Sequence, residues 1–152
     1  MFVKVSTHFC CTEEELWKEI TKQESLRFVA SPVLTFVPLN RKSFSGKWEE
    51  GGVYSFRLYL FSFIPLGSHT IQLVKADRKQ NTIESCESGL LVPVWNHRIS
   101  FNETKPGMVS YRDEIEIQAK LLTPFVFLFT HIFYRHRQRR WKKLLKGNST
   151  DG

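Results

Sequence analysis

Tyr111-Arg-Asp-Glu-Ile-Glu-Ile117 alternates apolar and polar residues, and shortly afterwards Leu121-Leu-Thr-Pro-Phe-Val-Phe-Leu-Phe-Thr-His-Ile-Phe-Tyr134 begins a long helical stretch. The alternation is typical of a strand with one buried face. Thr123 and Pro124 suit the N-cap and the first helical position, because the hydroxyl accepts an unpaired amide and proline has no amide donor. No helix breaker follows before Gly147. The apolar front half of this helix has to be buried against the strands that precede it.

Alternating and apolar segments predict seven strands, at residues 2–9, 33–38, 52–61, 68–76, 82–88, 92–102 and 109–118. Short, turn-prone connections separate the last six, which indicates an antiparallel meander. Between the first two strands, Thr12 and Glu15 form a capping box that starts a helix of about three turns. A second helical turn is expected around residues 25–29. The fold class is therefore α+β, with an antiparallel sheet of about seven strands and a long C-terminal helix.

The length of 152 residues and the composition, 41% hydrophobic and 24% charged, indicate one globular domain. We expect it to span residues 1–146, followed by a disordered tail over 147–152. The net charge of +7 is local, because residues 135–146 hold seven of the 22 Lys and Arg and no acid. Five of these side chains form a basic ridge: Arg135, Arg139, Lys142, Lys143 and Lys146. We interpret this ridge as solvated helix surface, with transient contact to an anionic membrane as the alternative. No zinc-finger or RNP signature is present, which argues against nucleic acid.

Metal, cofactor and disulfide chemistry are not indicated. Cys10, Cys11 and Cys86 form no C-x-x-C pair and have no histidine at zinc-ligand spacing. No glycine-rich dinucleotide motif follows a strand, so we expect no metal and no cofactor. Residues 1–7 alternate like a strand and lack the features of a signal peptide, and the apolar run 121–134 is too short to span a bilayer. We expect a cytoplasmic protein without a transmembrane helix.

Three motifs resemble the START-like, Bet v 1-like superfamily (SRPBCC), including its polyketide cyclase and dehydrase relatives. They are Trp95-x-His97 leading to Phe101, the strand Tyr111-Arg-Asp-Glu-Ile-Glu116, and Ile132-Phe-Tyr-Arg-His-Arg137, which is similar to the helix of many bacterial members. The segment 118–122 departs from the pattern, since it lacks the usual Pro and Gly. The resemblance implies a helix-grip fold, in which a curved sheet wraps the C-terminal helix and leaves an apolar cavity.

The resemblance also implies function, since members bind lipids, polyketides or other hydrophobic molecules and a minority are enzymes. Our leading hypothesis is that the protein binds such a molecule without a cofactor. The expected lining residues are Tyr54, Phe56, Leu58, Leu60, Ile71, Leu73, Trp95, His97, Ile99, Tyr111, Phe129, Phe133 and Arg137. The alternatives are a cyclase- or dehydrase-type enzyme and a filled core that serves as an interaction module.

His97 and Asp113 are the candidates for proton transfer. If Phe101 pairs with Val109, the antiparallel register places His97 opposite Asp113 on the inner face. A carboxylate that orients an imidazole is typical of a general base, but it also satisfies a buried histidine. We favour the structural interpretation, because no paired nucleophile is evident.

Arg137 and Arg140 lie on the helical stripe that carries Phe129 and Phe133. We predict that one of them pairs with Asp113 or with Glu87; the alternative is that they grip the anionic headgroup of a ligand. A second stripe consists of Phe127, Tyr134 and Trp141. It is either packed in the core or forms a homodimer contact.

Overall fold

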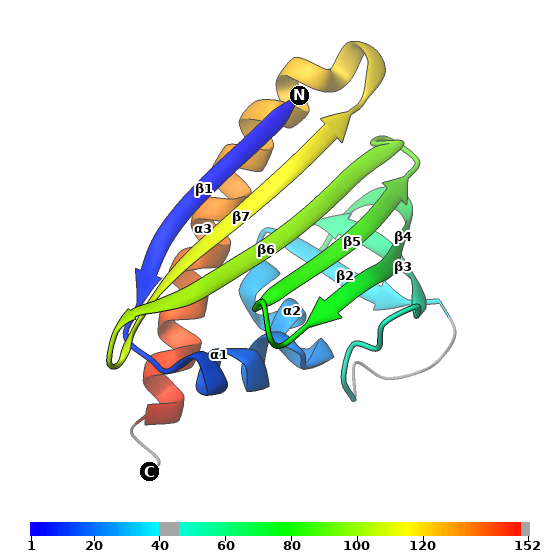
Figure 1. Ribbon diagram of the computed structural model, residues 1–152. Helices are drawn as coiled ribbons and strands as arrows, with labels where there is room; N and C mark the ends of the chain where they lie inside the picture. Colours follow the sequence, from blue (N-terminus) through cyan, green and yellow to red (C-terminus); the bar gives the residue numbers. More distant parts are fainter. Residues whose placement is uncertain (40–45, 150–152) are drawn as a thin grey trace.

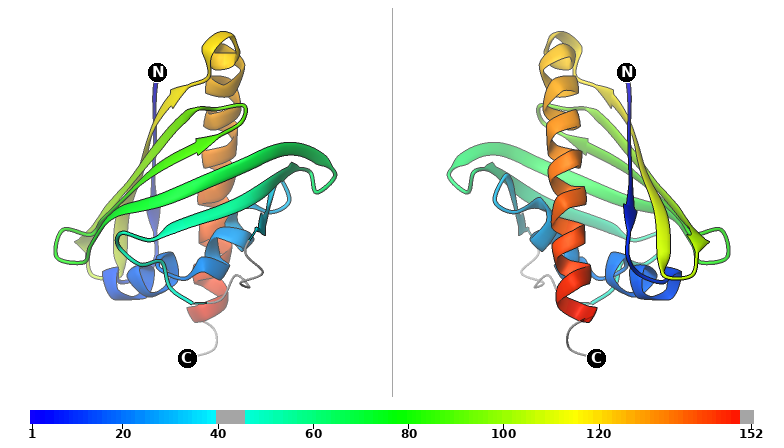
Figure 2. Two further views of the ribbon diagram at one scale, coloured as in Figure 1. Left: turned by 90° about the vertical axis from the view of Figure 1, so that its right-hand side faces the viewer. Right: turned by 90° about the vertical axis from the view of Figure 1, so that its left-hand side faces the viewer.

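The computed structural model describes residues 1–39 and 46–149. Its strands are β1 (Phe2–Phe9), β2 (Leu34–Pro38), β3 (Val53–Leu60), β4 (Ile64–Asp77), β5 (Thr82–Gly89), β6 (Val94–Lys105) and β7 (Met108–Gln118). Its helices are α1 (Glu13–Ile20), α2 (Gln23–Ala30), the 3-10 turn η1 (Lys120–Leu122) and α3 (Thr123–Ser149). The strands form one antiparallel sheet in the order β1-β7-β6-β5-β4-β3-β2 (Figure 1). The sheet curves around α3 (Figure 2), so the predicted α+β helix-grip fold is confirmed.

The capping box at the start of α1 is confirmed. The Thr12 hydroxyl accepts a hydrogen bond from the Glu15 amide at 3.1 Å, and the Glu15 carboxylate accepts one from the Thr12 amide at 3.4 Å. The helix is shorter than predicted, with eight residues. It ends at Ile20, and the amide and hydroxyl of the C-cap residue Thr21 both donate to the Trp17 carbonyl in the last turn.

The predicted N-cap of α3 is wrong. Thr123 has helical backbone angles, and its hydroxyl accepts from the Ala119 amide at 3.0 Å and donates to the Lys120 carbonyl at 2.8 Å. The side chain therefore closes the preceding η1 turn, and α3 starts at Thr123 itself. At its other end, α3 continues through residues 147–149, which we had assigned to the tail. Residues 150–152 of that predicted tail lie outside the described part of the chain.

The predicted register of the β6–β7 hairpin is also wrong, by two residues. Phe101 pairs with Tyr111 and Ile99 with Asp113, while His97 pairs with Ile115. The strands extend closer to the turn than predicted, since Lys105 already pairs with Met108, and the irregularity between Glu103 and Lys105 changes the register by one further residue. A shift of two residues leaves every side chain on its predicted face.

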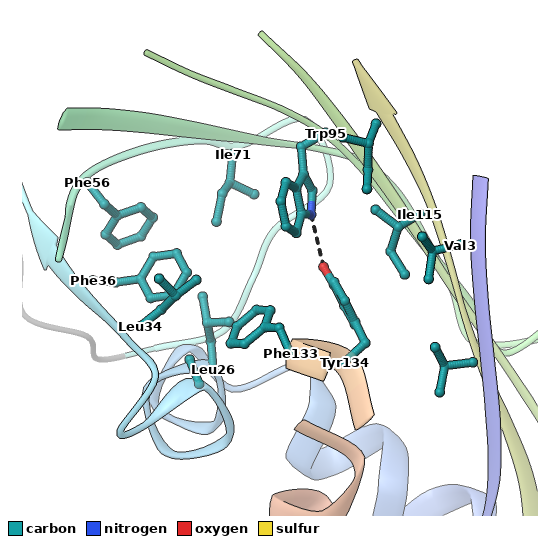
Figure 3. Close-up of a cluster of buried hydrophobic side chains, with 13 residues drawn as sticks. Val3, Leu26, Leu34, Phe36, Phe56, Ile71, Trp95, Ile115, Phe133 and Tyr134 are labelled. Atoms are coloured by element: carbon teal, nitrogen blue, oxygen red, sulfur yellow. Dashed lines mark hydrogen bonds between the residues drawn. The ribbon is translucent and has the colours of Figure 1, made fainter. Parts of the chain in front are cut away.

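The buried side chains form two clusters. One lies between the middle of the sheet and α3 and includes Trp95, Phe133 and Tyr134 (Figure 3). The other surrounds α1 and includes Leu16 and Trp141. Tyr134 and Trp141 are therefore packed in the core, which agrees with the first of the two interpretations of this stripe, core packing, and not with a homodimer contact through these two residues.

The basic ridge is exposed along its whole length, from Arg135 to Lys146. Within the described residues, no helix is both long enough and apolar enough to cross a membrane.

Candidate functional site

A cavity of ≈360 Å³ lies between the sheet and α3. This volume falls in the range of small-molecule sites, and the wall is mainly apolar. Most of the predicted lining residues reach it: Leu58, Leu60, Ile71, Leu73, Trp95, His97, Ile99, Phe129, Phe133 and Arg137. They meet there because alternate strand residues share one face of the sheet, while α3 places residues spaced by three and four on its facing side.

The other three predicted lining residues, Tyr54, Phe56 and Tyr111, lie outside the cavity wall. Tyr54 and Phe56 pack edge-on against Trp48, with ring centroids 4.7 and 6.5 Å away. Tyr111 is buried in the cluster around α1. All three point to the inner face, as predicted, but alternation sets only the face and not the position along a curved sheet.

The cavity has one open and one closed end. Leu90, Leu122 and Phe125 line it and are exposed by 74, 44 and 73%, so the opening lies between the β5–β6 turn and the start of α3. The buried Ile20 and Trp141 line the opposite end. The cavity thus follows α3 from Leu122 to Trp141, which is roughly 28 Å at the rise of an α-helix.

A buried histidine–carboxylate pair in the cavity wall was not foreseen from the sequence. His69 Nε2 lies 2.9 Å from Glu87 Oε1, and the Ser85 hydroxyl donates to Glu87 Oε2 at 2.8 Å. Burial raises the pKa of Glu87, but the hydrogen bond and the charge of His69 outweigh it, so the pKa lies below its usual value of 4.5. The sequence indicates only that Ser85 and Glu87, two residues apart on β5, lie on the same, inner face of the sheet.

Replacing Glu87 by glutamine is expected to remove a pH-dependent part of the stability. Because the pKa is lower in the folded state, the carboxylate stabilises the fold above its usual pKa of 4.5, and this contribution is lost as the pH falls through the lower folded value. The difference in free energy of unfolding between wild type and Glu87→Gln should therefore shrink from about pH 6 to about pH 3. Urea denaturation measures it.

Glu84→Gln is the control for this prediction, because Glu84 lies on the same strand and forms a surface pair with Arg98 at 3.4 Å. A wild-type to Glu87→Gln difference that stays constant over this pH range would contradict the role of the His69–Glu87 pair.

Asp113 is the centre of a buried hydrogen-bond network. Its Oδ1 lies 2.7 Å from His97 Nε2 and accepts from the Tyr111 hydroxyl at 2.9 Å. Its Oδ2 accepts from Gln138 Nε2 at 2.9 Å, and Gln138 also donates to the Val5 carbonyl. His97 reaches Asp113 diagonally across the hairpin, so the predicted contact forms despite the shifted register. Burial and the neighbouring carboxylate hold the pKa of Tyr111 well above its usual value, so its hydroxyl remains a donor.

The predicted ion pairs of Arg137 and Arg140 do not form with any described residue. Arg137 lines the cavity, and its guanidinium carbon lies 4.8 Å from the centroid of the Tyr134 ring. Burial lowers the pKa of Arg137, but Tyr134 and Asp113 raise it more strongly, so the group is a buried cation. Arg140 faces elsewhere: it stacks on Phe28 at 4.0 Å and donates to the Phe28 carbonyl at 3.2 Å.

Metal binding has no support in the described residues, which contain no cluster of three or more His, Cys, Asp or Glu side chains that suits an ion. Cys11 is buried, and burial raises its pKa to about 12, so its thiol is not poised as a nucleophile. The polar side chains of the cavity wall include the His69–Glu87 pair, His97 and the cation Arg137, with Asp113 behind His97.

Solved structures share this fold at low sequence identity. A protein from Chromobacterium violaceum superposes with a TM-score of 0.74 and 10% identity, covering 95% of this chain and 96% of its own. A START superfamily protein from Mycobacterium smegmatis superposes with a TM-score of 0.68 and 12% identity, and the match covers 96% of this chain and 97% of the other. Ara h 8.0201 superposes with a TM-score of 0.63 and 8% identity, and the match covers 97% of this chain and 98% of the other. The START-like, Bet v 1-like fold is thus confirmed.

Comparison of the sequence with curated proteins finds no match. A family model described as "Domain of unknown function (DUF8410)" matches residues 7–145. This range includes nearly all of α3 and every strand of the sheet, apart from the first part of β1. The chain therefore belongs to the DUF8410 family.

Proposed function

We propose that this protein binds a hydrophobic small molecule in the cavity between its sheet and α3. The observation that carries the proposal is the cavity of ≈360 Å³ with a mainly apolar wall and an exposed apolar opening at Leu90, Leu122 and Phe125. Burial of apolar ligand surface contributes about 25 cal/mol per Å², which is the driving force expected at such a wall. The likeness to a START superfamily protein from Mycobacterium smegmatis is consistent with this proposal.

The geometry favours binding over proton transfer. Both oxygens of Asp113 are engaged, by His97 and Tyr111 on one side and by Gln138 on the other. These contacts join β6, β7 and α3, as expected of a group that holds the fold together. The cyclase or dehydrase alternative has no comparable observation in its favour.

Filling the cavity should abolish binding. Leu58 lines the cavity from β3, so Leu58→Trp places a large ring in the ligand space. We expect the affinity for Nile red, a neutral apolar dye, to fall at least about tenfold, because the displaced apolar contacts are worth a few kcal/mol. Dye fluorescence titration measures this change.

Val53→Trp is the matched control, since Val53 lies on the same strand and is exposed on the other face. It should leave the affinity for the dye unchanged. Equal dye binding by the wild type and both variants, with all three folded, would place the dye outside the cavity and contradict the proposal. Failure of the wild type to bind the dye or a neutral lipid would contradict it as well.

A further inference from the structure

The cavity wall contains hydrogen-bond donors that have no acceptor. Within residues 1–39 and 46–149, two fully buried side-chain nitrogen atoms lack a hydrogen-bond partner, Arg137 Nε and Trp141 Nε1. Both residues line the cavity, and they lie one helical turn apart on α3. Arg137 is only 8% exposed, and its guanidinium forms neither a hydrogen bond nor an ion pair with a described residue. The nearby Asp113 and the Tyr134 ring stabilise the charge, but a buried guanidinium without a hydrogen-bonded anion is costly, so a partner from outside the chain is indicated.

The two buried carboxylates in and behind the wall, Glu87 and Asp113, already have partners. Glu87 has one oxygen bound by His69 and the other by Ser85. Asp113 likewise has a partner on each oxygen. Arginine and tryptophan side chains have no acceptor atom, so the unmet need is entirely for acceptors. A cationic ligand such as an amine is instead repelled by the charge of Arg137.

The position of Arg137 fixes which part of a ligand meets it. Along α3 the cavity runs from the exposed Leu122 and Phe125 past Phe129 and Phe133 to Arg137 and finally Trp141. Twelve residues of helix separate Phe125 from Arg137, which corresponds to roughly 18 Å of mainly apolar wall. A long apolar chain that enters through the opening therefore reaches the cation with its far end.

We propose that the ligand is a long-chain carboxylic acid, bound with its carboxylate against Arg137 and its chain directed toward the opening at Phe125. This inference rests on the proposed binding function and adds the chemical class of the ligand. The planar guanidinium suits a carboxylate because it donates two parallel hydrogen bonds, and such charge-assisted bonds are strong in an apolar site.

The experiment compares probes that share one chain and differ in the head. Nile red is bound to the protein and displaced by myristic acid, myristyl alcohol or methyl myristate. For the wild type, the acid should displace the dye at a concentration roughly ten- to a hundredfold lower than the alcohol or the ester. Arg137→Gln should lose this preference for the acid while it still binds the alcohol and the dye.

Arg139→Gln is the matched control, because it removes the same charge from an exposed position of the same helix. It should keep the preference for the acid. Equal displacement by all three probes on the wild type, or an unchanged preference in folded Arg137→Gln, would overturn the inference while leaving the binding function intact. Absence of dye binding by the wild type would instead overturn the proposed function. The head-group series on the wild type decides the matter even if Arg137→Gln fails to fold.

Discussion

Asp113→Ala is expected to lower the free energy of unfolding by about 3–5 kcal/mol, the range found when one partner of a buried charged pair is removed. Asp113 is fully buried and serves His97, Tyr111 and Gln138. Its removal leaves these donors without their acceptor in the interior. Urea denaturation of both proteins, with the midpoint and slope compared, measures the change.

Glu114→Ala is the control, because Glu114 is the next residue of β7 and points to the opposite face, where it forms a long surface contact of 3.6 Å with Arg112. We expect this variant to lose less than about 1 kcal/mol. Asp113→Asn should fall between the two, since the amide oxygen still accepts from one side. A loss for Asp113→Ala as small as that for Glu114→Ala would show that the network does not hold the sheet to α3.

Tyr134→Ala is expected to cost about 3–5 kcal/mol, as is typical for deletion of a buried aromatic side chain. The Tyr134 hydroxyl accepts a hydrogen bond from Trp95 Nε1 at 3.0 Å (Figure 3), and its ring lies 4.9 Å from the ring of His97. Truncation removes this contact between β6 and α3 and enlarges the cavity. Thermal or urea unfolding measures the loss.

Tyr134→Phe separates the contribution of the hydroxyl from that of the ring, and Tyr59→Ala serves as the control. Tyr134→Phe keeps the ring but leaves the Trp95 donor without an acceptor, so we expect a loss of about 1–2 kcal/mol. Tyr59→Ala truncates a half-buried tyrosine on the outer face of β3 and should cost less than about 1 kcal/mol. If Tyr134→Ala were no more destabilising than Tyr59→Ala, α3 would not be anchored through this side chain.

The alternation of apolar and polar residues was sufficient to predict the strands of the sheet and the face on which each side chain lies. The strand at 109–118 was predicted within one residue, and the inward positions of β6 were assigned correctly. The register of the hairpin was not predicted, because a pattern that repeats every two residues does not show how far the strands extend toward the turn, and here they extend to Lys105 and Met108. For the same reason, His97 and Asp113 were predicted to lie directly opposite each other, whereas in the structure they make contact diagonally across the two strands.

The polar part of the cavity was harder to predict. His69 and Glu87 are joined by the β4–β5 pairing, in which a register shift between Leu73 and Lys75 intervenes, so their meeting requires the folded sheet. Arg137 was placed correctly on the inner stripe of α3, but its lack of an ion partner depends on how the carboxylates are already bound. Sequence patterns report which face a residue occupies, whereas the satisfaction of its hydrogen bonds is a property of the packed interior.

The pairing of β1 with β7 has a consequence for biosynthesis. Phe2 pairs with Glu116, and the Met1 amine donates to the Ile117 carbonyl, so the first strand to be translated has its partner at the far end of the chain. At usual translation rates, roughly 5–20 s separate the synthesis of the two strands. Contacts so distant in sequence also make folding slow. Because α3 is translated after β7, the cavity between the sheet and α3 is complete only once both segments have left the ribosome, so the proposed ligand would meet a sheet that is already paired from β1 to β7.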